Sequence, residues 1–170
     1  DPPPIKAVAV WDTVFGKETK IDFGGKRASA TFRFNHADSD FRFTSRTLTD
    51  NVENAFQALA FDEKRRSFDC VLWSNATGGR RQKISQVWFP GSHGNVGGGC
   101  RDEGLSDLAL EWMMRKLQGA GLRFHDRRTL NDVFNPNIRG SIYNSHTGYW
   151  SSIPAANREI FALSPEMRRP

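Results

Sequence analysis

The stretch from Lys83 to Gly99, KISQVWFPGSHGNVGGG, constrains the fold of this 170-residue chain more than any other. Residues 84–89 place apolar side chains on both faces of an extended chain, which is typical of a strand buried on both sides in a parallel sheet. Pro90 and Gly91 end this strand, because proline has no N–H for a sheet ladder and glycine permits a sharp turn. The pattern predicts a buried strand over 84–89 with a turn directly after it.

A single histidine, His93, follows this turn. We expect it on the loop at the carboxyl end of the strand, the edge where reacting groups gather in open α/β sheets. Gly97, Gly98 and Gly99 permit positive φ angles and close backbone approach, which suits a loop shaped around a ligand or a neighbouring side chain. The alternative is a flexible connector that carries an incidental histidine.

An earlier apolar run, IKAVAV at 5–10, predicts a second buried strand, and Asp12 follows it after one residue. If the two strands are parallel members of one sheet, Asp12 shares the carboxyl edge with His93. The alternative is that Asp12 stabilises a local turn, as aspartates after strands often do.

Two segments have apolar side chains at helical spacing. We expect one helix over 52–60, capped by Asp50 or Asn51, and another over 105–117 that ends near Gly119 and Gly121. Residues 131–170 are rich in Asn, Pro, Gly and Ser, which indicates loops and short turns. The apolar positions are Val52, Ala55, Phe56, Leu59 and Ala60 in the first helix, and Leu105, Leu108, Ala109, Trp112, Met113 and Leu117 in the second.

Asp62 and Glu63 come directly before three basic residues, Lys64, Arg65 and Arg66. We expect these carboxylates to form ion pairs in the packed structure, with direct substrate contact as the alternative.

Charge and cysteine spacing narrow the class of protein. The net charge is +5, but the basic residues are scattered in pairs and no nucleic-acid-binding motif accompanies them, so we expect no nucleic-acid partner. Cys70 and Cys100 lack metal-site spacing, which predicts free thiols. Because no run has membrane-spanning length and no signal peptide opens the chain, a cytoplasmic location is expected.

His36, Asp38 and Asp40 alternate as metal ligands can. A calcium loop also needs a glycine at its sixth position and a distal glutamate, and neither follows at the required spacing. These residues therefore predict a solvated turn, and we expect neither a metal nor a cofactor.

Asp12 followed by His93 matches the second half of a Ser-Asp-His triad in the chain order of α/β hydrolases. In such a triad the histidine takes the serine proton and the aspartate orients the imidazole. A nucleophile elbow, G-x-S-x-G, does not occur in the chain. Ser92 comes nearest, but position 90 is proline, and a serine adjacent to His93 would not have the elbow geometry.

Five segments resemble, in consistent order, motifs of an uncharacterised α/β-hydrolase family related to type VI secretion phospholipase effectors, most of all its fungal branch. In this family a G-F-S-R-G elbow precedes the W-D-T-V segment, so the resemblance implies that residues 1–170 are a single domain formed by the carboxy-terminal portion of a catalytic domain. The segments are AVWDTV at 9–14, NAFQALAFDEKRRSF at 54–68, QVWFPGSHGNVGGG at 86–99, LALEWMMRKL at 108–117 and RGSIYNSHTGYW at 139–150.

The resemblance implies a partial α/β-hydrolase-like sheet with packed helices and an irregular carboxy-terminal segment. His93 would be the triad base and Asp12 the acid, although family members can draw their carboxylate from elsewhere. Asn95, which stands where bacterial members often have aspartate, and Gly97 and Gly98 are the candidate substrate-binding residues.

The implied function is that of a serine hydrolase for carboxylic esters, notably of lipids, to which this chain supplies the acid and base but not the serine. Besides the ester substrate, we expect a complementing amino-terminal half, or self-association, at the open edge of the strand at 5–10. The chain alone is then expected to be inactive. The alternative is a non-catalytic remnant that binds a partner through that edge or through its glycine-rich loop.

Overall fold

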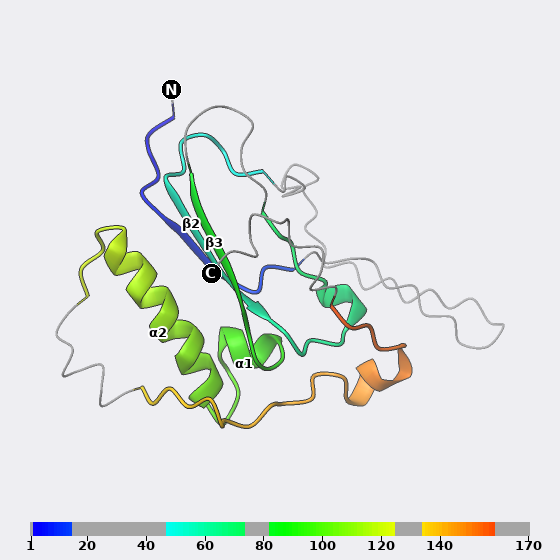
Figure 1. Ribbon diagram of the computed structural model, residues 1–170. Coiled ribbons are helices and arrows are strands. Elements are labelled where there is room, and N and C mark those ends of the chain that lie inside the picture. The colour runs from blue at the N-terminus through cyan, green and yellow to red at the C-terminus, as the bar shows by residue number, and fades with distance from the viewer. Residues whose placement is uncertain (1, 15–46, 74–81, 125–133, 159–170) are drawn as a thin grey trace.

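The computed structural model describes residues 2–14, 47–73, 82–124 and 134–158. Three parallel strands form a sheet in the order β1 (Val8–Trp11), β2 (Asn54–Ala60) and β3 (Lys83–Phe89). The other elements are the helices α1 (His93–Gly97) and α2 (Gly104–Gly119) and the short 3-10 helices η1 (Arg66–Phe68) and η2 (Gly148–Ser152) (Figure 1). The described part of the chain is therefore a small α/β structure.

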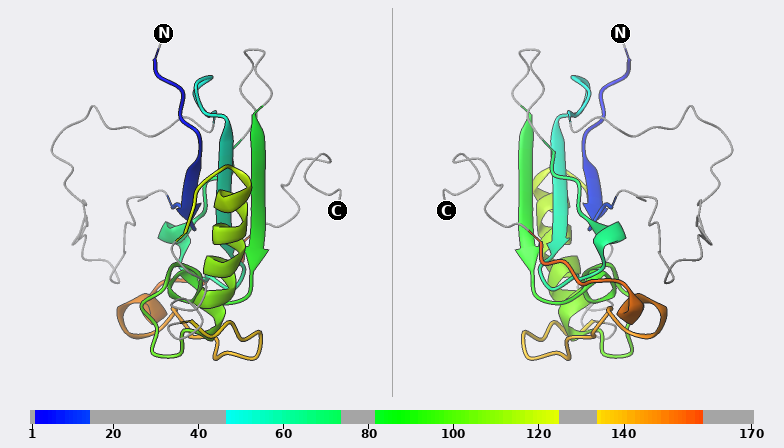
Figure 2. Two further views of the ribbon diagram at one scale, coloured as in Figure 1. Left: turned by 90° about the vertical axis from the view of Figure 1, so that its left-hand side faces the viewer. Right: turned by 90° about the vertical axis from the view of Figure 1, so that its right-hand side faces the viewer.

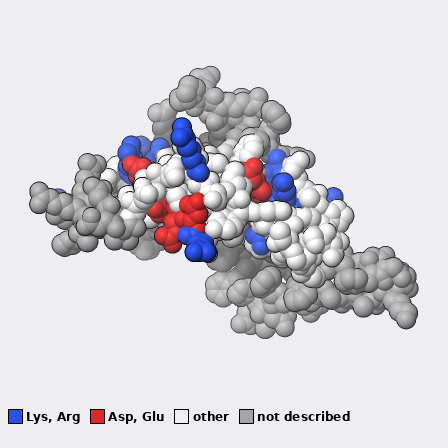
Figure 3. Space-filling view, turned by 90° about the horizontal axis from the view of Figure 1, so that it is seen from below, with Lys and Arg blue, Asp and Glu red and all other residues white. Residues whose placement is uncertain are grey.

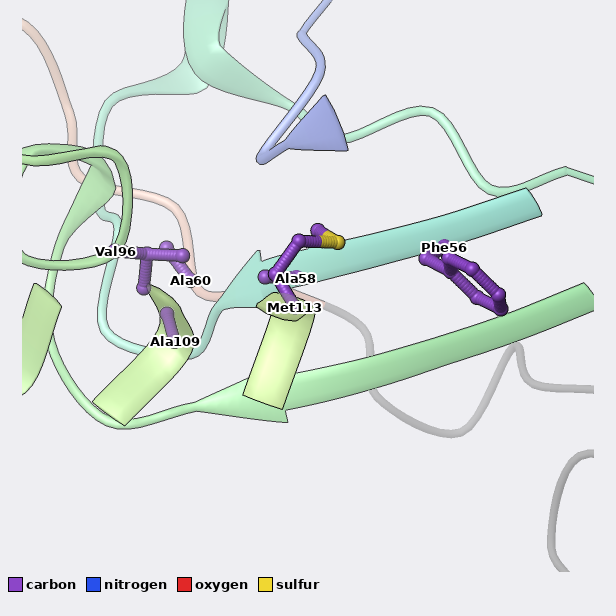
Figure 4. Packing of buried hydrophobic residues seen from close by; sticks show 6 residues of the cluster. All are labelled: Phe56, Ala58, Ala60, Val96, Ala109 and Met113. Carbon is purple, nitrogen blue, oxygen red and sulfur yellow. The ribbon is translucent and has the colours of Figure 1, made fainter. Parts of the chain in front are cut away.

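Helix α2 covers one face of the sheet (Figure 2). The helix and the sheet meet in a cluster of buried apolar side chains (Figure 4). Several of these are alanines, which allow the helix to approach the strands closely. Because α1 also contributes, the first residues after β3 are anchored in the same core. The cluster consists of Phe56, Ala58 and Ala60 from β2, Val96 from α1, and Ala109 and Met113 from α2.

The opposite face of β2 is covered by the extended segment 69–73. Gln57 Nε2 donates a hydrogen bond to the Val71 carbonyl at 3.0 Å, and Gln86 exchanges two hydrogen bonds with the backbone of Trp73. Residues 55–60 are consequently all buried, as expected of a central strand in a parallel sheet.

The prediction of a helix over 52–60 is wrong, because residues 54–60 form β2 and Val52 forms an isolated parallel bridge with Ile5. Nearly every side chain from 55 to 60 is apolar, and a continuous apolar run matches strand and helix spacing equally well. Backbone pairing with β1 on one side and β3 on the other selects the extended form. The expected cap Asn51 instead donates its Nδ2 hydrogen to the Pro3 carbonyl at 2.8 Å.

The other predicted elements are confirmed, with small shifts of their bounds. The runs at 5–10 and 84–89 correspond to β1 and β3, and the helix over 105–117 to α2. Gly121 has φ +101° and its N–H bonds the Gln118 carbonyl at 2.9 Å, as expected at a helix end. However, β3 is half-buried rather than buried on both sides, because it is an edge strand of the described sheet.

The segment 134–158 runs along the carboxyl edge of the sheet, past α1 (Figure 1). It is irregular except for η2, as predicted, and backbone hydrogen bonds from Asn137 to Gly104 and from Ala156 to Lys64 attach it. The expected turn at His36–Asp40 lies outside the described residues. None of the helices in the described ranges has the length and apolar content needed to cross a membrane.

Candidate active site

Polar side chains follow all three strands at the carboxyl edge of the sheet. Asp12 comes directly after β1, Glu63 follows β2, and His93 follows β3 after a short turn. Because the strands are parallel, their carboxyl ends meet at one edge. The expectation that Asp12 and His93 share this edge is therefore confirmed.

Asp12 and His93 are in direct contact. His93 Nδ1 lies 2.7 Å from Asp12 Oδ2. The Asp12 side chain is fully buried, whereas the His93 side chain is 34% exposed, so the imidazole can be reached from outside while the carboxylate cannot. His93 is the first residue of helix α1 and not a loop residue, which corrects the prediction of its local structure.

Asp12 has an unusual backbone conformation. Its φ of +44° makes it the one non-glycine residue in the described ranges that has a positive φ. Aspartate tolerates the left-handed region better than most residues, although at some energetic cost. Its N–H still continues the sheet by bonding the Ala58 carbonyl at 2.7 Å, and its Oδ1 accepts the Ala60 N–H at 2.8 Å. The turn thus aims the carboxylate across the end of β2.

Arg158 forms a two-pronged ion pair with the same carboxylate. Its Nη1 bonds Asp12 Oδ1, and its Nη2 bonds Asp12 Oδ2 at 2.9 Å. Burial alone would raise the pKa of Asp12, but the hydrogen bonds from His93 and Arg158 and the charge of the guanidinium hold that pKa below its usual value. An ionised carboxylate can only accept hydrogen bonds, so His93 Nδ1 carries the hydrogen and Nε2 is the free nitrogen of the neutral ring.

Glu63 is a second buried carboxylate at this edge, 1% exposed. Its Oε1 accepts hydrogen bonds from Arg65 Nε and Ser145 Oγ, each at 2.8 Å, and its Oε2 accepts the His93 N–H at 3.1 Å. Burial opposes ionisation, yet the bonds from Arg65, Ser145 and His93 lower the pKa of Glu63 to about 2. The predicted ion-paired packing of Glu63 is confirmed.

Asp62 packs against the turn that precedes His93. Its N–H donates to the Gly91 carbonyl at 2.9 Å, and its Oδ2 accepts the Gly91 N–H at 2.7 Å. Gly91 has φ +104°, and a Cβ there would lie 2.4 Å from the Cβ of Asn95. Both the backbone conformation and the lack of space require glycine at this position.

Asn95 is completely buried and ties α1 to the neighbouring segments. Its Oδ1 accepts hydrogen bonds from the N–H groups of Ser92 and Tyr143, and its Nδ2 donates to the Ser141 carbonyl at 3.0 Å. The side chain is thus fully engaged within the protein. The contact of Asn95 with substrate stays a prediction. The hydrogen bonds within the protein do not favour it, because they already occupy the side chain.

The glycines after α1 are exposed to solvent. Gly98 and Gly99 both have φ +93°, whereas Gly97 is the last residue of α1. A Cβ at any of the three would have no neighbour within 4 Å. Backbone conformation therefore explains the glycines at 98 and 99, and no side chain of the described residues packs closely against them, whereas close approach to a ligand stays a prediction.

Aromatic rings flank the imidazole on one side. The Phe68 ring meets His93 edge to face, with centroids 5.2 Å apart, and Trp150 meets Phe68 at 5.6 Å. The guanidinium of Arg65 lies 3.4 Å above the Phe68 ring. These contacts restrict the rotation of the imidazole and give it an apolar neighbour.

The sequence interpretation missed the importance of Glu63 and Arg158 for this site. Reading 54–60 as a strand would have placed Glu63 at the same edge as Asp12 and His93. Arg158 carried no such signal, because it is an isolated arginine in an irregular segment.

The surroundings of the site are chemically mixed. Acidic and basic side chains are interspersed with uncharged ones on the face seen from below (Figure 3).

Cys70 and Cys100 are both free, as predicted. No group of three or more His, Cys, Asp or Glu side chains within the described residues is arranged to hold a metal ion.

Comparison with known proteins identifies the family. The family model of the type VI secretion (T6SS) phospholipase effector Tle1-like catalytic domain matches residues 1–116. This range includes Asp12, Glu63 and His93 and ends before the segment that carries Arg158. No curated protein and no solved structure matches the chain. The family match covers more than half of the sequence, and the chain belongs to the family of Tle1-like phospholipase effector catalytic domains.

Proposed function

We propose that this chain supplies the acid and base of a serine hydrolase that cleaves carboxylic esters of lipids. The observation that carries the proposal is the 2.7 Å contact between His93 Nδ1 and the buried, ionised Asp12 at the carboxyl edge of a parallel sheet. The phospholipase family supports lipid esters as the substrate class. The overall α/β-hydrolase-like fold of residues 1–170 is part of the same proposal.

In this proposal His93 Nε2 takes the proton of a serine hydroxyl as its oxygen attacks the ester carbonyl carbon. Asp12 holds the Nδ1–H tautomer and stabilises the imidazolium that forms. The imidazolium then protonates the departing alcohol, which leaves an acyl-serine for water to hydrolyse. Gly97 and Gly98, at the exposed end of α1, are the proposed contacts with the substrate, whereas Asn95 holds α1 in place.

The serine would come from a G-x-S-x-G segment that precedes Asp1 in the complete catalytic domain. A parallel strand added beside β1 would end at the carboxyl edge that already carries Asp12 and His93. Within the described residues β1 is an edge strand, so such a strand would also cover an edge that favours pairing with another chain.

The test is hydrolysis of short- and long-acyl esters by this chain alone and by a version extended upstream through the serine. We expect activity in the extended protein only, and its loss in His93→Ala. Asp50→Asn is the control for a substitution away from the site, because Asp50 is an exposed carboxylate at the opposite edge of the sheet. A folded extended protein with no esterase activity would contradict the proposal and favour a binding module.

A further inference from the structure

The segment after η2 returns to the carboxyl ends of the strands (Figure 1). The Ala156 N–H bonds the Lys64 carbonyl at 3.0 Å, which brings Arg158 over the end of β2. From there its guanidinium reaches both oxygens of Asp12, the Ala60 carbonyl at 2.7 Å and the Phe68 carbonyl at 2.5 Å. One side chain therefore joins the residue after β1 to the last residues of β2 and η1.

Arg158 is nearly as buried as the carboxylate that it contacts, since its side chain is 4% exposed and that of Asp12 is 0% exposed. Its planar fork matches the two Asp12 oxygens, a geometry that lysine cannot reproduce. With the Ala60 N–H on Oδ1 and His93 on Oδ2, each oxygen has two donors. The carboxylate consequently has a single orientation, and that orientation presents Oδ2 to His93 Nδ1.

We propose that Arg158 is the positioning residue of the Asp12–His93 pair, and that the segment 134–158 is an integral part of the site. The inference rests on the proposed function. It goes beyond the family match, which ends at residue 116. The same segment supplies Ser145 to Glu63 and the backbone of residues 141 and 143 to Asn95, so it also supports the residues around His93.

The guanidinium has an electrostatic effect as well as a geometric one. Part of the negative charge of Asp12 is balanced by Arg158, so the carboxylate attracts the imidazolium less strongly than an unpaired one would. The other ionisable groups nearby are Glu63, which accepts the His93 N–H, its partner Arg65, and Cys70 and Asp69 beside the ion pair. Removing the guanidinium would leave the full charge of Asp12 to face the imidazolium.

Three variants in the serine-containing catalytic domain test this inference. We expect Arg158→Lys to lower kcat/KM on the order of 100-fold through misplacement of Asp12, with the acid limb of the pH profile unchanged because the positive charge is kept. Arg158→Gln should lower kcat/KM by at least as much and move the acid limb to higher pH. Arg115→Gln is the control, because Arg115 pairs with Glu111 on the surface of α2. If Arg158 only stabilised the fold, its replacement would lower the fraction of active protein and would leave the acid limb of the pH profile at the same pH.

NMR of the histidine-labelled protein separates this inference from the proposed function. The proton that His93 Nδ1 shares with Asp12 should give a downfield signal that broadens or disappears in Arg158→Gln, whether or not the protein hydrolyses esters. If His93→Ala abolishes activity while both Arg158 variants keep normal kcat/KM and pH limbs, the inference fails and the function stands.

The unsubstituted protein gives a further test if the variants do not fold. Titration of His93 should shift the guanidinium resonances of Arg158, because both side chains donate to the same carboxylate. Resonances of Arg158 that do not respond to this titration would overturn the inference.

Discussion

Asp12 and His93 lie 81 residues apart in the sequence, and their side chains meet at 2.7 Å because two strands run parallel with β2 between them. The contact needs no flexible loop on the acid side, since the turn after β1 fixes Asp12 with a positive φ. The pair is therefore already organised before any substrate binds.

Replacing Asp12 by asparagine should remove most of the activity of the serine-containing protein. An amide donates as well as accepts, so it can no longer enforce the Nδ1–H tautomer, and we expect kcat to fall by about 10⁴-fold. Arg158 would also lose its charged partner, at a cost of about 3 kcal/mol in the free energy of unfolding. Ester hydrolysis and urea unfolding measure the two effects. Asp50→Asn should change neither, and an Asp12→Asn enzyme of near-normal kcat would exclude Asp12 as the acid.

Glu63 should make the stability of the fold pH-dependent in the acid range. Its pKa of about 2 in the folded protein lies below the ordinary 4.5, so its contribution is present above pH 4.5 and is lost as the pH falls toward 2. Over this pH range we expect the free energy of unfolding of the wild type to fall by about 2 to 3 kcal/mol relative to that of Glu63→Gln. Urea unfolding at each pH measures this difference.

The control for Glu63 is Glu53→Gln, because Glu53 forms an exposed pair with Lys6 at 2.6 Å. Such surface pairs contribute little, so this variant should follow the wild-type pH dependence. Identical pH dependence of stability in the wild type and in Glu63→Gln would rule out the proposed ionised state of Glu63.

Asn95→Asp should destabilise the protein even though the two side chains have the same shape. The donor to the Ser141 carbonyl would become a carboxylate oxygen facing that carbonyl in a buried position. We expect the free energy of unfolding, measured by chemical denaturation, to fall by about 2 kcal/mol. Asn54→Asp is the matched control, because Asn54 Nδ2 makes the same kind of bond to the Lys6 carbonyl at an exposed site. Equal effects of the two substitutions would refute the buried role of Asn95.

Gly91→Ala should cost more stability than Gly121→Ala, although the two glycines have φ angles of +104° and +101°. At Gly121 the added Cβ meets nothing within 4 Å, so only the backbone conformation is penalised, by about 1 to 2 kcal/mol. At Gly91 the Cβ would overlap Asn95, and α1 must move with His93. Thermal unfolding compares the two, and equal losses would show that the turn has more room than the structure indicates.

Local sequence patterns were sufficient for the outer strands, for α2 and for the polar residues that end β1 and β3. Each of these features depends on neighbours in the sequence: an apolar run, a helical spacing that continues to Gly119, or a proline and a glycine after a strand. The placement of Asp12 and His93 at one edge followed from those patterns together with the rule that parallel strands end at the same side.

Tertiary structure decided the form of residues 52–60 and the partners of Asp12. The apolar run from Ala55 to Ala60 suits helix and strand alike, and only hydrogen bonding to both β1 and β3 makes it the central strand. That assignment in turn moves Glu63 to the edge that carries His93.

Arg158 shows most clearly what local sequence patterns do not predict, because it lies 146 residues from Asp12 and no local pattern marks it. Its place depends on the path of the segment 134–158 across the sheet edge. By itself, the sequence determined which polar side chains follow β1 and β3 and which segments are apolar enough to pack. Only the folded chain decided which charges are buried together, because burial and ion pairing arise between segments that are distant in sequence.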